Sequence, residues 1–310
     1  MEVWAKRDDV GSVGLAGNKV RKLETLLAHA QATGATHIVT EGSRHSNATR
    51  AAAAAAAAIG MKCTLVLCHD EPKEPVGNLL LDALFGAQLR LVGDVSWPEL
   101  AELTAGVVRE LEQSGERVYR LPIGSAAGRG AASFAYAYAE AEQQLKDHGT
   151  AFRTIVHASS AGSTHAGLML GRALRAESTR IIGVVVAGGV YDDVPGTYLR
   201  LANEAADLIA PGIRITHSDL ELTEDYLGEG YGKPAMGVTE AIDLMARLEG
   251  IVVDPVYTAK AVAAIIDMAR TGSIEGPVLF WHTGGYHSMF DPKYASAVWS
   301  DLPRLHGIVL

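Results

Sequence analysis

The sequence contains only two cysteines, Cys63 and Cys68, and both lie in the apolar stretch MKCTLVLC. A zinc site needs more ligands at a different spacing, and a disulfide framework needs a denser set of cysteines. We therefore expect neither, and no metal site of another kind is indicated. The pattern favours a reduced protein of the cytoplasm.

Positive charge is also scarce, because 27 Lys and Arg stand against 36 Asp and Glu, for a formal net charge of −9. Binding to nucleic acid needs a basic patch that neutralises phosphates, and none is present. No apolar run is long enough to cross a membrane. The charged start MEVWAKRDDV lacks the apolar segment of a signal peptide. We expect neither nucleic acid nor membrane as a partner.

The chain does contain a regular alternation of short β-rich runs with helical patterns. Its 310 residues are 48% hydrophobic, enough for one large or two modest domains. Strand–helix alternation is typical of an α/β fold with mostly parallel sheets. The stretch 121–133 is the best candidate for a crossing between two interleaved domains. The expected strands are 36–42, 62–68, 88–93, 153–160, 180–188 and 276–285.

A lysine follows a run of small residues at a helix start, in AGNKVRKLE (16–24). A lysine amine is nucleophilic only without its proton, and a dry, electropositive site favours that form. Lys19 is therefore a candidate for covalent chemistry. The alternative is an ordinary helix start with a solvated Lys19, and we expect Arg21 and Lys22 to be solvated helix charges.

Two further stretches place polar residues between a strand and a helix. In EGSRHSNATR, Ser46 and Asn47 lie where free backbone N–H groups favour anions and polar ligands. In SSAGSTHAG, a glycine and two hydroxyls, Gly162 to Thr164, form the pattern of a phosphate cradle. The nucleotide-binding fingerprints GxGxxG and GxxxxGK[ST] are absent from this loop. Simple helix capping and a plain strand-to-helix turn remain the alternatives.

The last group of candidates lies near the C-terminus. Tyr231 and Tyr257 occur in loops that precede helical patterns, and Thr283 ends an apolar strand. Loops at the ends of strands are where open α/β sheets build ligand sites. Each tyrosine alone carries little information, because buried tyrosines commonly serve to satisfy a hydrogen bond.

Taken together, these stretches resemble one family over almost the whole chain. It is the fold-type II, pyridoxal-phosphate-dependent group that contains D-cysteine desulfhydrase and 1-aminocyclopropane-1-carboxylate (ACC) deaminase. The family pattern GGNKxRKLE is similar to AGNKVRKLE, QSNxxR to HSNATR, and TGSTxAG to AGSTHAG. The tyrosines of its EYGxP and DPVY segments match Tyr231 and Tyr257.

The resemblance implies a fold and a cofactor. The fold is two three-layer α/β domains with mostly parallel sheets, and pyridoxal 5'-phosphate lies in the cleft between them. Residues 20–130 would form the smaller, inserted domain. Residues 1–19 and 131–310 would form the larger, cofactor-binding domain. Relatives of this kind suggest a homodimer.

The resemblance also implies roles for single residues. Lys19 would form the Schiff base with the cofactor, and Lys19 or Ser46 would remove the substrate proton. Ser46, with Asn47 and Tyr257, would contact the substrate. Tyr231 or Tyr257 would donate to the departing group or position the substrate carboxylate. The cofactor would be held by Lys19, Asn47, Ala161, Gly162, Ser163, Thr164, Thr258 and Thr283.

Two positions separate the branches of this family. ACC deaminases resemble DPVYEGK and HLGG, whereas this chain has Thr258 and Thr283 at those places, as the desulfhydrase branch does. A carboxylate beside the pyridine nitrogen keeps that nitrogen protonated and strengthens the electron sink, whereas a hydroxyl supports a neutral ring. Loss of a thiolate needs less electron withdrawal than opening a cyclopropane. Thr258 and Thr283 therefore disfavour ACC as the substrate.

The chain also departs from the family pattern. His45 replaces a glutamine, Ala16 a glycine and Ala126 an asparagine, and Tyr286 and His287 stand where many relatives are apolar. An ionisable group beside Ser46 would alter substrate choice, so we predict that His45 binds substrate. The alternative for His45, as for His165 and His287, is an ordinary packed or surface histidine. A leading segment found in relatives is missing or trimmed.

The resulting hypothesis is a pyridoxal-phosphate-dependent lyase or deaminase of a small amino acid. D-Cysteine would give pyruvate, ammonia and sulfide. ACC, D-serine, L-cysteate or a specialised substrate of similar size are the alternatives within that class. From other classes, a non-catalytic pyridoxal-phosphate-binding protein and a cofactor-free binding module remain open.

Overall fold

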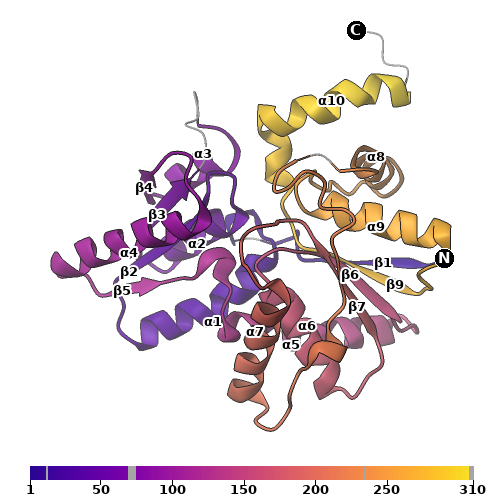
Figure 1. The fold of residues 1–310 in the computed structure, drawn as a ribbon, viewed down its shortest axis with the longest axis horizontal. Helices are drawn as coiled ribbons and strands as arrows, with labels where there is room; N and C mark the ends of the chain where they lie inside the picture. Colours follow the sequence, from indigo (N-terminus) through magenta and orange to yellow (C-terminus); the bar gives the residue numbers. More distant parts are fainter. Residues whose placement is uncertain (12, 69–74, 234, 307–310) are drawn as a thin grey trace.

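A computed structural model describes residues 1–11, 13–68, 75–233 and 235–306 (Figure 1). The described chain forms two sheets, and every strand pair in both of them is parallel. Parallel neighbours need a crossover, and helices supply it here, as in the alternating pattern of the sequence. The fold is therefore α/β with parallel sheets, as predicted.

The larger sheet has the strand order β1-β9-β6-β7-β8. Its strands are β1 (Val3–Arg7), β6 (Thr154–Ser159), β7 (Arg180–Val185), β8 (Leu222–Thr223) and β9 (Val278–His282). Helices α5 (Gly128–Asp147), α6 (Ser163–Leu174) and α7 (Val194–Ile209) cover one side. Helices α8 (Val238–Glu249) and α9 (Thr258–Thr271) cover the other, and α10 (Pro292–His306) follows at the end of the chain.

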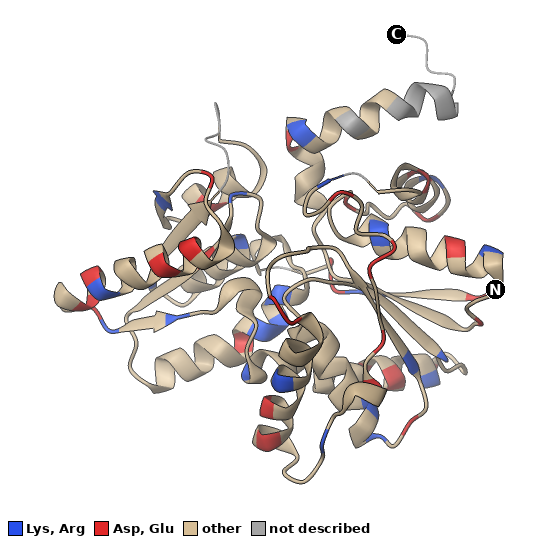
Figure 2. Ribbon diagram, in the orientation of Figure 1, with Lys and Arg blue, Asp and Glu red and all other residues tan. Residues whose placement is uncertain are grey.

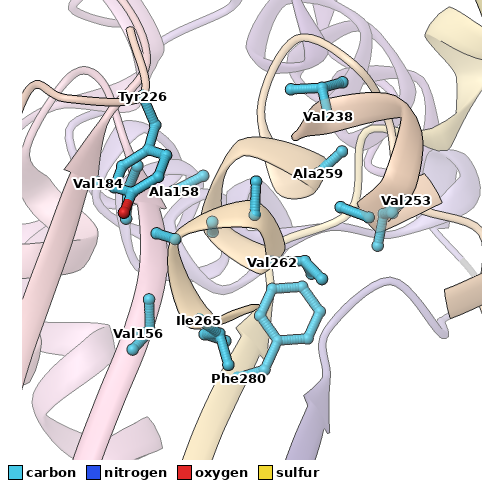
Figure 3. Close-up of a cluster of buried hydrophobic side chains, with 14 of the residues drawn as sticks. Val156, Ala158, Val184, Tyr226, Val238, Val253, Ala259, Val262, Ile265 and Phe280 are labelled. Atoms are coloured by element: carbon cyan, nitrogen blue, oxygen red, sulfur yellow. The ribbon is translucent and has the colours of Figure 1, made fainter. Parts of the chain in front are cut away.

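The core beneath α9 shows why these strands are apolar throughout. Val156 and Phe280 of the sheet pack against Val262 and Ile265 of α9 (Figure 3). On the opposite face, Trp281 and Ile155 pack against Phe134 of α5. Both faces of the sheet are thus covered, which is the situation that produces continuous hydrophobic strands.

The smaller sheet has the order β4-β3-β2-β5. Its strands are β2 (His37–Ser43), β3 (Lys62–Cys68), β4 (Gln88–Leu91) and β5 (Val118–Arg120). Helices α1 (Asn18–Ala32), α2 (Asn47–Ala58) and α3 (Gly77–Leu84) pack on one face, and α4 (Trp97–Gln113) packs on the other. Short 3-10 helices are η1 (Val13–Leu15), η2 (Ile123–Ser125), η3 (His217–Asp219) and η4 (Tyr286–Phe290).

The two cysteines lie on opposite faces of β3, because side chains alternate along a strand. Cys63 joins the cluster under α1 and α2, and Cys68 joins the one under α4. Both are free thiols whose pKa is raised by burial, to about 12 for Cys63 and about 11 for Cys68. They are structural residues. No cluster of metal-binding side chains occurs among the described residues.

The expectation that Arg21 and Lys22 are solvated is wrong. Lys22 is 2% exposed, and its ammonium lies 5.6 Å from the centre of the Phe134 ring. Arg21 is half-buried and pairs with Asp8 and Glu140. Lys22 is buried because one face of helix α1 packs on the smaller sheet and α5 covers the other face of the same helix.

Elsewhere in the described chain, positive and negative residues are mixed, as expected from 27 Lys and Arg against 36 Asp and Glu. Both blue and red residues occur on α4 and α7 in Figure 2, and neither helix presents a basic face. Among the described residues, no helix is both long and apolar enough to span a membrane. The domain bounds at residues 20 and 130 stay a prediction, although the stretch 121–133 does lead from β5 of one sheet to α5 beside the other.

Candidate active site

A cavity lies where the carboxyl ends of strands from the two sheets meet. Ser43 from the end of β2, Ser159 from the end of β6 and Thr283 just after β9 all line it. Strand ends of parallel sheets are the usual place for a ligand in such folds. Most of the predicted site residues line this cavity, namely Lys19, Ser46, Asn47, Ala161, Gly162, Thr164, Tyr231, Tyr257 and Thr283.

Two lysines from the first turns of α1 enter this cavity, Lys19 and Lys22. Their spacing of three residues puts both on one face of the helix. The Lys19 amine donates a hydrogen bond of 2.9 Å to Oδ1 of Asn18. Burial and the positive charge of Arg50 lower the pKa of Lys19 to about 8, and burial beside Lys19 lowers the pKa of Lys22 well below its usual value. With a pKa of about 8, the Lys19 amine is available as a nucleophile near neutral pH.

The loop before α6 has the geometry of an anion cradle. Gly162 has a φ of 89°, which turns the chain into the helix. The Ser163 hydroxyl is fully buried and has no hydrogen-bond partner among the described residues. Asn18 donates to the Thr164 hydroxyl across 3.0 Å, so the cradle is tied to the lysine-bearing helix. Three features together fit a phosphate group: the Ser163 hydroxyl, which has no partner among the described residues, the N-terminus of α6, and the buried amine of Lys22.

The start of α2 supplies polar groups on the opposite wall. The Ser46 hydroxyl caps the helix by accepting from the N–H groups of Ala48 and Thr49, at 3.2 and 3.4 Å. The Asn47 amide oxygen accepts from Asn78 at 2.9 Å. Both side chains still line the cavity. Capping and ligand binding are therefore compatible here, because capping uses Ser46 as an acceptor and leaves its O–H proton to donate.

Two phenols close the site. The hydroxyls of Tyr231 and Tyr257 are 2.6 Å apart, and Tyr231 also lies 3.3 Å from the Ser43 hydroxyl. Burial raises the pKa of both tyrosines, of Tyr257 more strongly. They are therefore neutral hydrogen-bond donors at physiological pH. Their short contact joins them into one unit, so a proton given by one is replaced through the other.

The two threonines of the DPVYTAK and HTGG segments are placed differently. Thr283 lines the cavity. Thr258 is fully buried and does not, because its hydroxyl donates to Oδ1 of Asp254 at 2.7 Å. Asp254 in turn accepts from the N–H groups of residues 256, 257 and 258. This fully satisfied carboxylate shapes the turn that presents Tyr257, and a role of Thr258 at the cofactor stays a prediction.

His45 points away from the cavity. Its Nδ1 lies 3.0 Å from the Asp291 carboxylate, and its ring packs edge-on against Tyr294. His45 is not among the lining residues, and its role in substrate binding stays a prediction. His165 is packed as expected, with Nδ1 3.0 Å from His157, and burial lowers the pKa of His287 to about 3.

Three residues near the lysine were not predicted from the sequence. Asn18 links the lysine turn to Thr164, Lys22 adds a second buried amine to the cavity wall, and Arg50 is buried and contacts the lysine turn. A sequence signal existed for Lys22, because residues three apart share one helix face. Arg50 is the last residue of the HSNATR motif, but nothing in that motif showed its contact with the lysine turn, which joins segments 34 residues apart.

Comparison with known proteins gives a consistent result. A family model described as "Pyridoxal-phosphate dependent enzyme" matches residues 1–284. The chain is 39% identical to a 1-aminocyclopropane-1-carboxylate deaminase of Burkholderia vietnamiensis, over 92% of this chain and 87% of that protein. It is 36% identical to a D-cysteine desulfhydrase of Serratia proteamaculans, over 93% of this chain and 86% of that protein.

A solved structure agrees with these relatives. A crystal structure of an ACC deaminase homologue superposes with a TM-score of 0.88 at 34% identity, covering 96% of this chain and 88% of that one. The anion cradle before α6 and the low pKa of Lys19 fit the phosphate and the aldehyde of such a cofactor. The cofactor is pyridoxal phosphate, and the chain belongs to the family of pyridoxal-phosphate-dependent enzymes.

Proposed function

We propose that this protein is a lyase that eliminates the β-substituent of a small amino acid, with D-cysteine as the preferred type of substrate. D-Cysteine and water would yield pyruvate, ammonia and sulfide, which balances the reaction. One observation supports the choice of D-cysteine over ACC. Among the described residues that line the cavity there are lysines, hydroxyls and amides, but no aspartate or glutamate.

A cavity without a carboxylate suits an easy leaving group. Bound pyridoxal phosphate supplies an electron sink for the charge that develops at the substrate Cα. That sink is strongest when a carboxylate keeps the pyridine nitrogen protonated. Thiolate leaves readily and needs a weaker sink than the opening of a cyclopropane does. Thr283, which lines the cavity as a neutral hydroxyl, is consistent with the weaker sink.

The chain's own residues divide the remaining work. Lys19 attaches the cofactor covalently and takes the Cα proton, which its low pKa permits. Ser163, Thr164 and Lys22 hold the phosphate. Ser46 and Asn47 bind the substrate carboxylate, with Ser46 as the second candidate for the proton transfer.

A substrate panel tests the proposal. Purified protein loaded with pyridoxal phosphate is given D-cysteine, D-serine, L-cysteate and ACC, and keto acid and ammonia are measured for each. We expect the highest kcat/KM with D-cysteine and stoichiometric sulfide release. Turnover of ACC alone would contradict the argument from the missing carboxylate and from Thr283. Absence of any product with a loaded cofactor would favour a non-catalytic binding protein.

ACC deamination is the second candidate function. The observation in its favour is the similarity reported above, since relatives with that name reach 39% identity over 92% of the chain. The panel separates the two candidates directly, because ACC gives ammonia and a keto acid without sulfide. We also propose a homodimer, whose mass light scattering would measure on the loaded enzyme.

The tyrosine pair provides a prediction that does not depend on the choice of substrate. Tyr231→Phe and Tyr257→Phe each remove one partner of the 2.6 Å contact. We expect each variant to lose about 10²-fold in kcat/KM, a usual contribution of proton transfer. Because the two phenols act as one unit, the double variant should be scarcely worse than either single variant. Losses that multiply would show that the hydroxyls act independently.

A further inference from the structure

Arg50 is a fully buried cation that the proposed chemistry leaves unused. It lies on α2 with no exposed surface, one turn after the polar residues Ser46 and Asn47. Its Nη2 donates to the backbone carbonyl of Ala16 across 3.1 Å. A buried charge is costly, so a side chain of this kind is retained for a specific contact. The contact here is to the turn that precedes Lys19.

That turn is strained. Its four residues, Gly14, Leu15, Ala16 and Gly17, have φ values of 52°, 63°, 56° and 106°. Glycine adopts the left-handed region freely, but Leu15 and Ala16 do so only when the surroundings hold them there. Backbone bonds fix the end of the turn, because Gly17 donates to Asp8 at 2.9 Å and Asn18 donates to Thr283 at 3.0 Å. Arg50 is the side chain that fixes its middle.

The charge of Arg50 is not cancelled by a direct hydrogen bond to a carboxylate. Asp82 of α3 faces it, yet both Asp82 oxygens and the Nε and Nη1 atoms of Arg50 are buried without a hydrogen-bond partner among the described residues. Tyr286 and His287 of η4 and Lys19 of α1 are the other titratable groups near Arg50. Burial raises the pKa of Asp82 well above its usual value, which further weakens it as a counter-charge.

We propose that Arg50 is the positioning residue for Lys19. Its guanidinium holds the strained turn 14–17 through the Ala16 carbonyl, and its positive charge, which has no hydrogen-bonded carboxylate among the described residues, adds to burial in favouring the neutral, nucleophilic form of the neighbouring amine. Arg50 acts through Lys19 and the turn, without touching the substrate. The proposal rests on the proposed function in one respect only, namely that Lys19 is the residue that attaches the cofactor and takes the Cα proton.

The test uses the full chain without cofactor, so it does not depend on activity. Trace labelling with acetic anhydride across a pH series, followed by mass spectrometry, reports the midpoint at which Lys19 becomes reactive. The wild type is expected near pH 8. Arg50→Gln keeps a donor for the Ala16 carbonyl but removes the charge. We expect it to move the midpoint upward by about half a unit or more. Arg50→Lys keeps the charge and should leave the midpoint within a few tenths of the wild-type value.

Amide hydrogen exchange tests whether Arg50 holds the turn 14–17 in place. Arg50→Lys retains a single donor in place of the planar guanidinium, so the amides of Gly17 and Asn18 should exchange faster, by about tenfold. Arg172→Gln is the control, because Arg172, like Arg50, donates to a backbone carbonyl, although it also pairs with Asp219, and it lies on α6, outside the cavity lining. This control should alter neither the Lys19 midpoint nor exchange at residues 17 and 18.

The outcomes that overturn the proposal are specific. An unchanged Lys19 midpoint in folded Arg50→Gln would remove the electrostatic role, and unchanged exchange in Arg50→Lys would remove the positioning role. If Arg50→Gln does not fold, Arg50→Lys alone still decides, since a midpoint shifted by half a unit or more contradicts the claim that the charge matters. Failure of the proposed function would appear in the substrate panel while these two measurements remain valid.

Discussion

Lys19→Ala is expected to lower the turnover of D-cysteine by about 10³-fold or more, since the same amine attaches the cofactor and moves the proton. The variant should also fail to retain pyridoxal phosphate covalently. Borohydride reduction followed by peptide mass spectrometry measures that attachment directly. In the wild type, capture should increase as the pH rises through about 8, because the amine becomes nucleophilic only when it loses its proton.

Lys22→Ala is the matched control on the same helix face. Lys22 lines the same cavity but is predicted to hold phosphate rather than to form the covalent bond. We expect it to weaken cofactor affinity, while Lys19 is still captured at saturating pyridoxal phosphate. Equal loss of capture in both variants would show that the two lysines cannot be separated, and capture at Lys22 in the Lys19 variant would reassign the roles.

Gly162→Ala is expected to lower cofactor affinity by about 10- to 100-fold, the cost of one or two charge-assisted hydrogen bonds. It should also lower the free energy of unfolding by about 2 to 4 kcal/mol. The added Cβ would lie 2.4 Å from the ring of Tyr198 at a φ of 89°. That ring cannot move aside, because its hydroxyl accepts from Ser159 and donates to the Ser160 carbonyl. The cradle loop itself must therefore shift.

Gly60→Ala separates two contributions to the loss of unfolding free energy, namely the left-handed backbone conformation and the steric clash of the added Cβ. Gly60 has a φ of 71° and nothing within 4 Å of its added Cβ, and it lies outside the cavity lining. We expect a loss of about 1 kcal/mol in unfolding free energy and unchanged cofactor affinity. Titration of cofactor absorbance and urea unfolding measure the two quantities. A Gly162 variant that behaved like the Gly60 control would show that the cradle tolerates a side chain.

Much of the architecture was predictable because it depends on local patterns. The alternation of β-rich and helical runs predicted the parallel sheets. The alanines of α2 show how close the helices then pack, because Ala51 and Ala52 are fully buried. The site was predictable for a related reason, since residues at the ends of parallel strands meet at one edge of a sheet. Ser46, Thr164 and Thr283 meet there.

The surroundings of single charged residues were not predictable in this way. Lys22 and Arg50 resemble ordinary helix charges in the sequence, yet α5 covers the first and the turn 14–17 covers the second. His45 stands beside Ser46 in the chain, but its ring turns to Asp291 from the far end of the sequence. Burial and partners of this kind depend on contacts between distant segments, which no local pattern records.

The sequence alone therefore determined the α/β class and the order of the elements, and it pointed to the lysine, hydroxyl and tyrosine groups of the candidate site, because each of these depends on short-range periodicity or on a motif. The tertiary structure decided which of those groups face one cavity and how acidic Lys19 is. It did so because a pKa depends on desolvation and on nearby charges, and both the burial of Lys19 and the charge of Arg50, which lies on a separate helix, arise from contacts between distant segments.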